Sequence, residues 1–184
     1  MINNMNANEA MQALKQADCL YTNEQVQSAI ERVASEITQK LEKRNPLVLC
    51  VMTGGLIPAG HILTGLNFPL QLDYIHATRY QGDIRGGVLS WLVKPTFSLY
   101  GRDILIIDDI FDEGITLSEI VEFCSAEGAN DIFTAVLVNK IHDRKTSLQV
   151  DFVGLETEDK YLFGYGMDYH DYLRNAPGIY AVKD

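Results

Sequence analysis

The sequence lacks the features that define several large classes of protein. Among its 184 residues the longest apolar run is about Leu47–Met52, far short of the ~20 residues that cross a bilayer. No basic segment followed by an apolar core opens the chain, so we recognise no secretory signal. The three cysteines (Cys19, Cys50 and Cys124) are odd in number and widely spaced, which indicates neither a disulfide framework nor a CxxC metal site. We therefore expect a cytoplasmic protein with no membrane span.

Positive charge is also scarce. Lys and Arg total 15 against 25 Asp and Glu, a formal net charge of −10. A protein that binds nucleic acid usually carries a basic face, so we expect no nucleic-acid partner. The four histidines show no paired metal-binding spacing, and a structural or surface role is favoured for each of them. They are His61, His76, His142 and His170.

The pattern of apolar residues predicts one domain over residues 1–184 in which strands alternate with helices. The first 45 residues have helical periodicity, and Thr22 with Gln25 forms a capping-box pattern. Strands are predicted at 47–52, 70–80, 104–107, 132–138 and 152–155, with a further, antiparallel strand at 88–93. Helices are predicted at 56–66 and 116–126, the second with Thr116 and Glu119 as a capping box. This alternation predicts an α/β fold with a mostly parallel central sheet flanked by helices, and ligands gather at the carboxyl ends of such strands.

The most informative stretch is ILIIDDIFDEGIT, residues 104–116. Asp108, Asp109, Asp112 and Glu113 stand within six positions, and no Lys or Arg occurs between Arg102 and Lys140. Crowded carboxylates raise one another's pKa unless a cation or hydrogen-bond donors satisfy them, as a magnesium ion or sugar hydroxyls would. The helix that follows offers free backbone N–H groups and the Thr116 hydroxyl, and Gly114 lets the backbone approach an anion closely. The turn thus suits a sugar phosphate.

A simpler interpretation stays open, in which the acids only complement the dipole of the following helix. It explains little about Asp108 and Asp109, which precede the turn. Competing motifs are absent: there is no GxxxxGK[ST] loop, no GxGxxG after a strand and no DxDx[TV].

These residues resemble the signature of the type I phosphoribosyltransferases, which use 5-phosphoribosyl 1-diphosphate (PRPP). Features over residues 46–174 narrow the resemblance to the hypoxanthine/guanine phosphoribosyltransferases. Met52-Thr53-Gly54-Gly55 resembles the diphosphate loop with its non-proline cis peptide, here between Met52 and Thr53. Residues 78–80 match the start of the flexible catalytic loop, here about 82–87, Lys140 matches the purine-reading lysine, and residues 161–169 with Arg174 match the base-binding hood segment.

The chain departs from the family pattern at three positions. Glu113 stands where many relatives have a threonine or serine, Ile115 where many have a lysine, asparagine or histidine, and Thr53 where some have a lysine, so we expect diphosphate contact at Thr53 through the backbone. We expect the Glu113 side chain to point away from the phosphate while its N–H serves it. The resemblance also implies a small hood subdomain, built from the N-terminal segment and about residues 155–184, and a homodimer or homotetramer.

The resemblance implies transfer of the phosphoribosyl group from PRPP to N9 of hypoxanthine or guanine, with Mg²⁺ as cofactor and IMP or GMP and diphosphate as products. Asp112 would be the catalytic base or acid at purine N7, with a pKa raised by its acidic neighbours. The other implied roles are ribose-phosphate binding by Asp108, Asp109, Glu113, Gly114, Ile115 and Thr116; diphosphate binding by Thr53, Gly54, Arg79 and Arg174; purine binding by Lys140, Tyr161 and Leu162; and metal binding by Asp168 and Asp108.

Alternatives remain for several of these residues. In isolation Lys140 could be a solvated lysine after a strand, Tyr161 a generic buried aromatic, and Arg79 a partner in a surface salt bridge. The whole chain could also be a regulator that binds PRPP or nucleotides and contacts RNA or DNA, which its acidic charge argues against.

Overall fold

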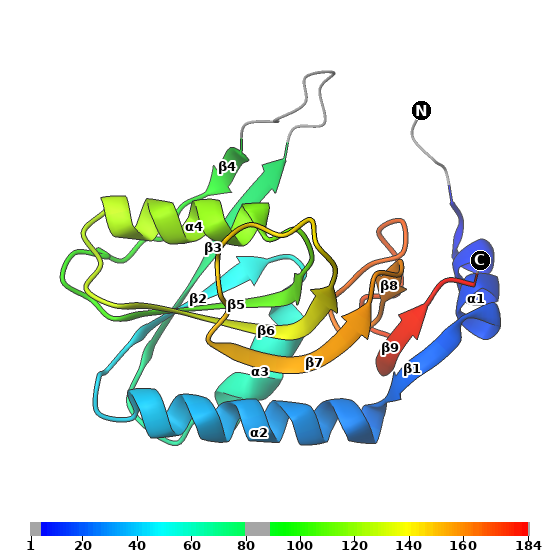
Figure 1. Ribbon diagram of the computed structural model, residues 1–184, viewed down its shortest axis with the longest axis horizontal. Helices are drawn as coiled ribbons and strands as arrows, with labels where there is room; N and C mark the ends of the chain where they lie inside the picture. Colours follow the sequence, from blue (N-terminus) through cyan, green and yellow to red (C-terminus); the bar gives the residue numbers. More distant parts are fainter. Residues whose placement is uncertain (1–4, 80–88, 184) are drawn as a thin grey trace.

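The protein is built on a six-stranded sheet with helices on both faces (Figure 1). The computed structural model describes residues 5–79 and 89–183. The strand order is β4-β3-β2-β5-β6-β7, and all neighbours run parallel except β3 and β4. The predicted α/β class and the antiparallel strand are therefore confirmed. The strands are β2 (Leu47–Met52), β3 (Gln71–Arg79), β4 (Leu89–Val93), β5 (Ile104–Phe111), β6 (Ile132–Ile141) and β7 (Phe152–Glu158).

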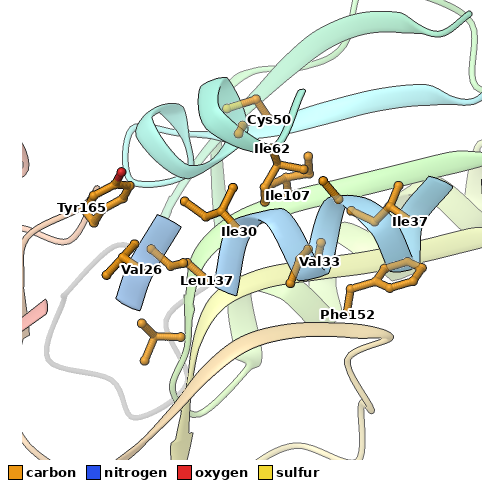
Figure 2. Close-up of a cluster of buried hydrophobic side chains, with 14 of the residues drawn as sticks. Val26, Ile30, Val33, Ile37, Cys50, Ile62, Ile107, Leu137, Phe152 and Tyr165 are labelled. Atoms are coloured by element: carbon orange, nitrogen blue, oxygen red, sulfur yellow. The ribbon is translucent and has the colours of Figure 1, made fainter. Parts of the chain in front are cut away.

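Helices cover the two faces of this sheet with separate apolar cores. Helix α4 (Ile115–Ala126) lies on one face, whereas α2 (Asn23–Leu41) and α3 (Leu56–Thr64) lie on the other (Figure 1). Figure 2 shows how α2 points Val26, Ile30, Val33 and Ile37 toward the sheet. These side chains are at most 4% exposed, which is the burial expected from their 3–4-residue spacing. The predicted Thr22–Gln25 capping box is present at the start of α2.

The N-terminal region was predicted to be helical throughout, but it also contains a strand. Strand β1 (Asp18–Thr22) separates α1 (Ala7–Gln16) from α2 and pairs with β9 (Gly178–Ala181), which also pairs with β8 (Leu162–Phe163). Pairing between the two ends of the chain leaves no signal in the local periodicity, which explains the error. The resulting sheet, β1-β9-β8, lies beyond the end toward which β5, β6 and β7 run (Figure 1).

Strand β5 is longer than the predicted 104–107. Its parallel pairing with β6 continues through Asp108 to the pair Phe111 and Asn139, so the two aspartates belong to the strand itself. Along the described parts of the chain, we find no helix with the length and apolar character needed to cross a membrane.

Candidate active site

The acidic strand end leads into a helix whose first turn has no side-chain cap. Helix α4 begins at Ile115, and its N-cap Gly114 has φ +80°, a left-handed conformation that glycine adopts without strain. The N-cap residue is a glycine and makes no side-chain capping bond, so the predicted Thr116–Glu119 capping box is wrong. The N-cap position is Gly114, two residues before Thr116, so Thr116 lies inside the helix. Uncapped amides at a helix N-terminus suit an anion.

A cavity of about 350 Å³ runs along this turn. It brings together residues from β2, the loop after it, β5, the start of α4 and the C-terminal segment. Most of the residues predicted to bind ribose phosphate or diphosphate line this cavity, and so does the predicted catalytic residue Asp112. The binding residues are Gly54, Asp108, Asp109, Glu113, Gly114, Ile115, Thr116 and Arg174.

Two glycines allow the walls of this cavity to meet. A Cβ built on Gly54 would lie within 2.8 Å of both carboxylate oxygens of Asp109. A Cβ on Gly166, which has φ +112°, would collide with the carbonyl oxygen of Gly54. The peptide bond before this loop, Met52–Thr53, is cis as the resemblance implied. Glycine is therefore required where the loop after β2, the acidic strand and the C-terminal segment converge.

The two strand aspartates form a buried acidic pair. Burial raises the pKa of Asp108 well above its usual range, and the neighbouring charge of Asp109 raises it further. Burial also raises the pKa of Asp109, while the Asp109 N–H donates to Asp108 Oδ1 at 2.9 Å. Arg174 opposes both shifts through its positive charge. The expected effect of a neighbouring carboxylate is thus present at Asp108, whereas at Asp109 burial alone raises the pKa and the hydrogen bond with Asp108 lowers it. A cation or hydroxyl donors would stabilise the pair.

Asp112 has the opposite shift from the one predicted. Burial raises its pKa, but hydrogen bonds from Lys140 and His142 outweigh burial and hold the pKa below its usual range. Lys140 Nζ lies 2.8 Å from Asp112 Oδ2, and His142 Nε2 lies 2.8 Å from Oδ1. The sequence prediction failed because both partners stand 28 to 30 positions away, at the end of the adjacent strand β6. The lowered pKa therefore favours the ionised form of the Asp112 carboxylate.

A second cavity of about 230 Å³ adjoins the first. The two share Asp109, Ile110 and Asp112 in their linings. The second is also lined by Lys140, Tyr161, Leu162, Met167 and Asp168, which include all three predicted purine residues. Tyr161 is 52% exposed and packs edge-on against Tyr169, with ring centroids 5.7 Å apart. This exposure excludes the alternative, left open by the sequence, that Tyr161 is a generic buried aromatic.

The predicted metal ligand and a predicted diphosphate contact are bonded to each other. Arg174 Nη2 lies 2.7 Å from Asp168 Oδ1, and Arg174 Nη1 donates to the Gly166 carbonyl at 2.6 Å. The Asp171 N–H donates to the other oxygen of Asp168 at 2.9 Å. Since Arg174 lines the first cavity and Asp168 the second, this pair connects the two.

Some predicted site residues are placed elsewhere. Thr53 is exposed and lines neither cavity. Arg79 ends β3, and its side chain lies outside the described residues, as does the predicted catalytic loop at 82–87. The Glu113 carbonyl accepts from the Thr146 N–H at 2.9 Å, and the residue makes a further interaction.

His142 is the site residue that the sequence did not reveal. Its only signal was its place two residues after Lys140. Ligand atoms of Asp112, His142 and Asp159 lie within 4.8 Å of one another, a spacing that could suit a metal ion. However, Lys140 Nζ contacts Asp112 at 2.8 Å and Asp159 at 3.7 Å, so an ammonium group already neutralises these acids.

An acidic strand end and a helix N-terminus in one cavity, with a second cavity beside it, suit a protein that binds a sugar phosphate together with a second group. Comparison with known proteins narrows this class. The family model for the phosphoribosyl transferase domain matches residues 16–170. The chain belongs to the phosphoribosyltransferase family, in the branch of the hypoxanthine-guanine phosphoribosyltransferases.

Relatives of known name support this assignment. The chain is 32% identical to the hypoxanthine-guanine phosphoribosyltransferase of Bacillus subtilis, over 89% of this chain and 92% of that protein. It is 30% identical to the hypoxanthine-guanine-xanthine phosphoribosyltransferase of Tritrichomonas foetus, over 90% and 91%. Among solved structures, a variant of the hypoxanthine phosphoribosyltransferase of Trypanosoma cruzi superimposes with a TM-score of 0.85 at 26% identity, covering 92% of this chain and 97% of that one.

Proposed function

We propose that the protein is a purine-salvage enzyme that transfers the 5-phosphoribosyl group from PRPP to N9 of hypoxanthine or guanine. The products would be IMP or GMP and diphosphate. The observation that carries this proposal is the pair of adjoining cavities that share Asp109, Ile110 and Asp112. One cavity has the acids and helix amides that suit a sugar phosphate, and the other has the lysine and aromatic side chain that suit a purine.

In the first cavity, Asp108 and Asp109 would accept hydrogen bonds from the ribose 2′ and 3′ hydroxyls. Their burial favours such donors, because water cannot solvate the carboxylates fully. The 5-phosphate would bind to the backbone amides of residues 113–116 and to the Thr116 hydroxyl. The diphosphate would bind to the backbone at Thr53 and Gly54 and to the guanidinium groups of Arg79 and Arg174, since arginine suits bidentate oxygen contacts.

The acidic residues fit a bound Mg²⁺ ion. Carboxylate oxygens are its preferred protein ligands, and the buried Asp108 has a raised pKa that a cation would relieve. Asp168 would be the second ligand, presented at the edge of the second cavity by Arg174 and the Asp171 amide. When bound, Mg²⁺ would supply Lewis-acid stabilisation of the leaving diphosphate.

In the second cavity, Asp112 would accept the proton that purine N7 carries as N9 attacks the sugar. Its lowered pKa keeps it ionised near neutral pH, as a proton acceptor must be. Lys140 would donate to the purine 6-oxo oxygen, which selects against adenine because adenine has a donor amine there. Tyr161 would stack on the ring, and main-chain groups of Leu162 would contact the 2-position.

An assay with PRPP, Mg²⁺ and each of hypoxanthine, guanine, xanthine and adenine tests the proposed activity. We expect nucleotide and diphosphate in equal amounts with hypoxanthine and guanine, and at least tenfold lower kcat/KM with adenine. The rate with xanthine would define the acceptance of a 2-oxo group. Absence of turnover with both hypoxanthine and guanine would refute the proposal.

We also propose that the chain forms one domain, with the β1-β9-β8 sheet and about residues 155–184 as its hood, and works in the cytoplasm as a homodimer or homotetramer. The free cysteines, including the exposed Cys19, suit a reducing compartment. Leu72 and Tyr74 lie on one face of β3 and are 51% and 46% exposed, which suits contact between subunits. A mass measured by light scattering equal to that of one chain would contradict the proposed assembly.

A further inference from the structure

His142 holds the side chain of Asp112 from outside both cavities. The ring is buried, with its side chain only 8% exposed, and Nε2 lies 2.8 Å from Asp112 Oδ1. Among the described residues that line the two cavities, Asp112 and Lys140 occur but His142 does not. His142 therefore supports Asp112 from behind and does not face a ligand in either cavity.

The other ring nitrogen fixes the direction of this hydrogen bond. His142 Nδ1 accepts from the Arg144 backbone N–H at 3.1 Å. A nitrogen that accepts carries no hydrogen, so the neutral ring has its hydrogen on Nε2 and donates it to Asp112. The backbone thus selects the ring tautomer whose Nε2–H can hold the carboxylate.

The two oxygens of Asp112 have different partners. Oδ1 is held by His142, whereas Oδ2 is bonded to Lys140 Nζ at 2.8 Å. Lys140 lines the purine-side cavity and also lies 3.7 Å from Asp159. If Lys140 turns toward the 6-oxo group of a purine, Oδ2 loses its partner and is left to accept the N7 proton. Oδ1 keeps its partner, so the carboxylate keeps its orientation.

The segment that carries His142 is attached to the acidic turn at a second point. The Thr146 N–H donates to the Glu113 carbonyl at 2.9 Å, and the hydroxyls of Thr146 and Ser118 lie 2.9 Å apart. Since these contacts do not involve the histidine, replacing its side chain should leave the main chain of both segments in place.

We propose that His142 is a positioning residue for proton transfer to Asp112. It anchors Oδ1 so that Oδ2 faces the purine when Lys140 binds the base; this role rests on the proposed function. The balance of the step is simple: the N7–H bond breaks, the proton moves to Oδ2, and the electron pair remains on the purine as the N9–C1′ bond forms and diphosphate leaves.

Two substitutions separate this role from a purely structural one. His142→Leu removes the donor at similar volume, and we expect kcat to fall about 10- to 100-fold, as for a misplaced catalytic group. His142→Gln can present an amide N–H near the Nε2 position, and kcat should stay within about threefold of the unmodified enzyme. The KM for PRPP should change less than about twofold in both, because the first cavity does not contain His142. If the leucine variant fails to fold, His142→Asn, which is too short to reach, should show the same loss.

The control is His61→Asn, on the exposed side of α3, where kcat should not change. The positioning role would be overturned by a kcat within twofold in His142→Leu, by equal losses in the leucine and glutamine variants, or by a loss confined to the KM for PRPP. A failure of the proposed function is distinguishable, since it would appear as no turnover in the unmodified enzyme assayed alongside.

Discussion

Replacing Asp108 by asparagine should make the ligand-free protein more stable while it destroys activity. Burial, followed by the charge of Asp109, raises the pKa of Asp108, so the ionised form is disfavoured in the folded state. Asparagine has nearly the same shape, and its Oδ1 can still accept from the Asp109 N–H that now bonds to Asp108 Oδ1 at 2.9 Å. The substitution therefore removes a buried charge and retains the hydrogen bond.

The size of the effect follows from the environment of the carboxylate. Leaving a buried polar group poorly satisfied costs about 1–3 kcal/mol, and more for a charge, but Arg174 partly compensates Asp108. We therefore expect a gain of about 1–3 kcal/mol. For a chain of this size, about 2–4 °C in Tm corresponds to each kcal/mol, so Tm should rise by about 2–12 °C.

The sign of the pH dependence follows from the raised pKa. Because the folded-state pKa of Asp108 is above the unfolded value of about 3.9, its destabilising effect is complete above the folded-state pKa. It disappears as the pH falls toward the unfolded value. The difference in Tm between variant and unmodified protein should thus be largest at neutral pH and shrink on acidification.

Thermal unfolding with EDTA, followed by circular dichroism from pH 8 to pH 5, measures these differences. The matched control is Asp131→Asn, in which the lost carboxylate is 53% exposed and ion-paired to Arg44; its Tm should stay the same or fall. An Asp108→Asn variant with native circular dichroism but an unchanged or lower Tm at pH 7.5 would refute the reasoning that a charge is held there at a cost in stability.

Three further substitutions test the other parts of the site. Lys140→Ala should lower kcat/KM for hypoxanthine about 10- to 150-fold, the equivalent of a charged hydrogen bond of about 1.5–3 kcal/mol. Near-normal rates would contradict the proposal that Lys140 recognises the base, and Lys183→Ala is the control. Gly54→Ala should raise the KM for PRPP at least about tenfold, because the added Cβ collides with Asp109; an unchanged KM would contradict the close approach. Asp112→Asn should lower kcat about 10²- to 10⁴-fold while calorimetry shows PRPP still binding, and a loss of binding with normal kcat would contradict its role.

The sequence predicted the parts of the fold that depend on continuous local patterns. Strand β2 matches its apolar run residue for residue, because a parallel strand buried on both faces has no polar position to interrupt it. Strand β1 was missed because its partner β9 is at the other end of the chain. The end of β5 was missed because polar residues usually mark the end of a strand, whereas here pairing with β6 continues through them.

At the site, the sequence predicted most of the residues that line the two cavities, but not the direction of the pKa shift of Asp112. Lys140, Tyr161 and Leu162, the residues to which the resemblance gave purine binding, line one cavity. The pKa of Asp112 was predicted in the wrong direction, since the sequence shows only its acidic neighbours and not the two donors that β6 brings alongside. His142 could not be recognised for the same reason: its proposed role depends on the contact with Asp112 across the sheet and on the Arg144 backbone N–H.

A crystal structure with bound IMP is the most direct test of whether the two cavities form one active site. The 5′-phosphate should contact the amides of residues 113–116, and the ribose hydroxyls should contact Asp108 and Asp109. The hypoxanthine ring should lie against Tyr161, with its 6-oxo oxygen on Lys140 and N7 beside Asp112. A nucleotide bound elsewhere, or one with its base outside the cavity of Lys140 and Tyr161, would contradict the proposed site.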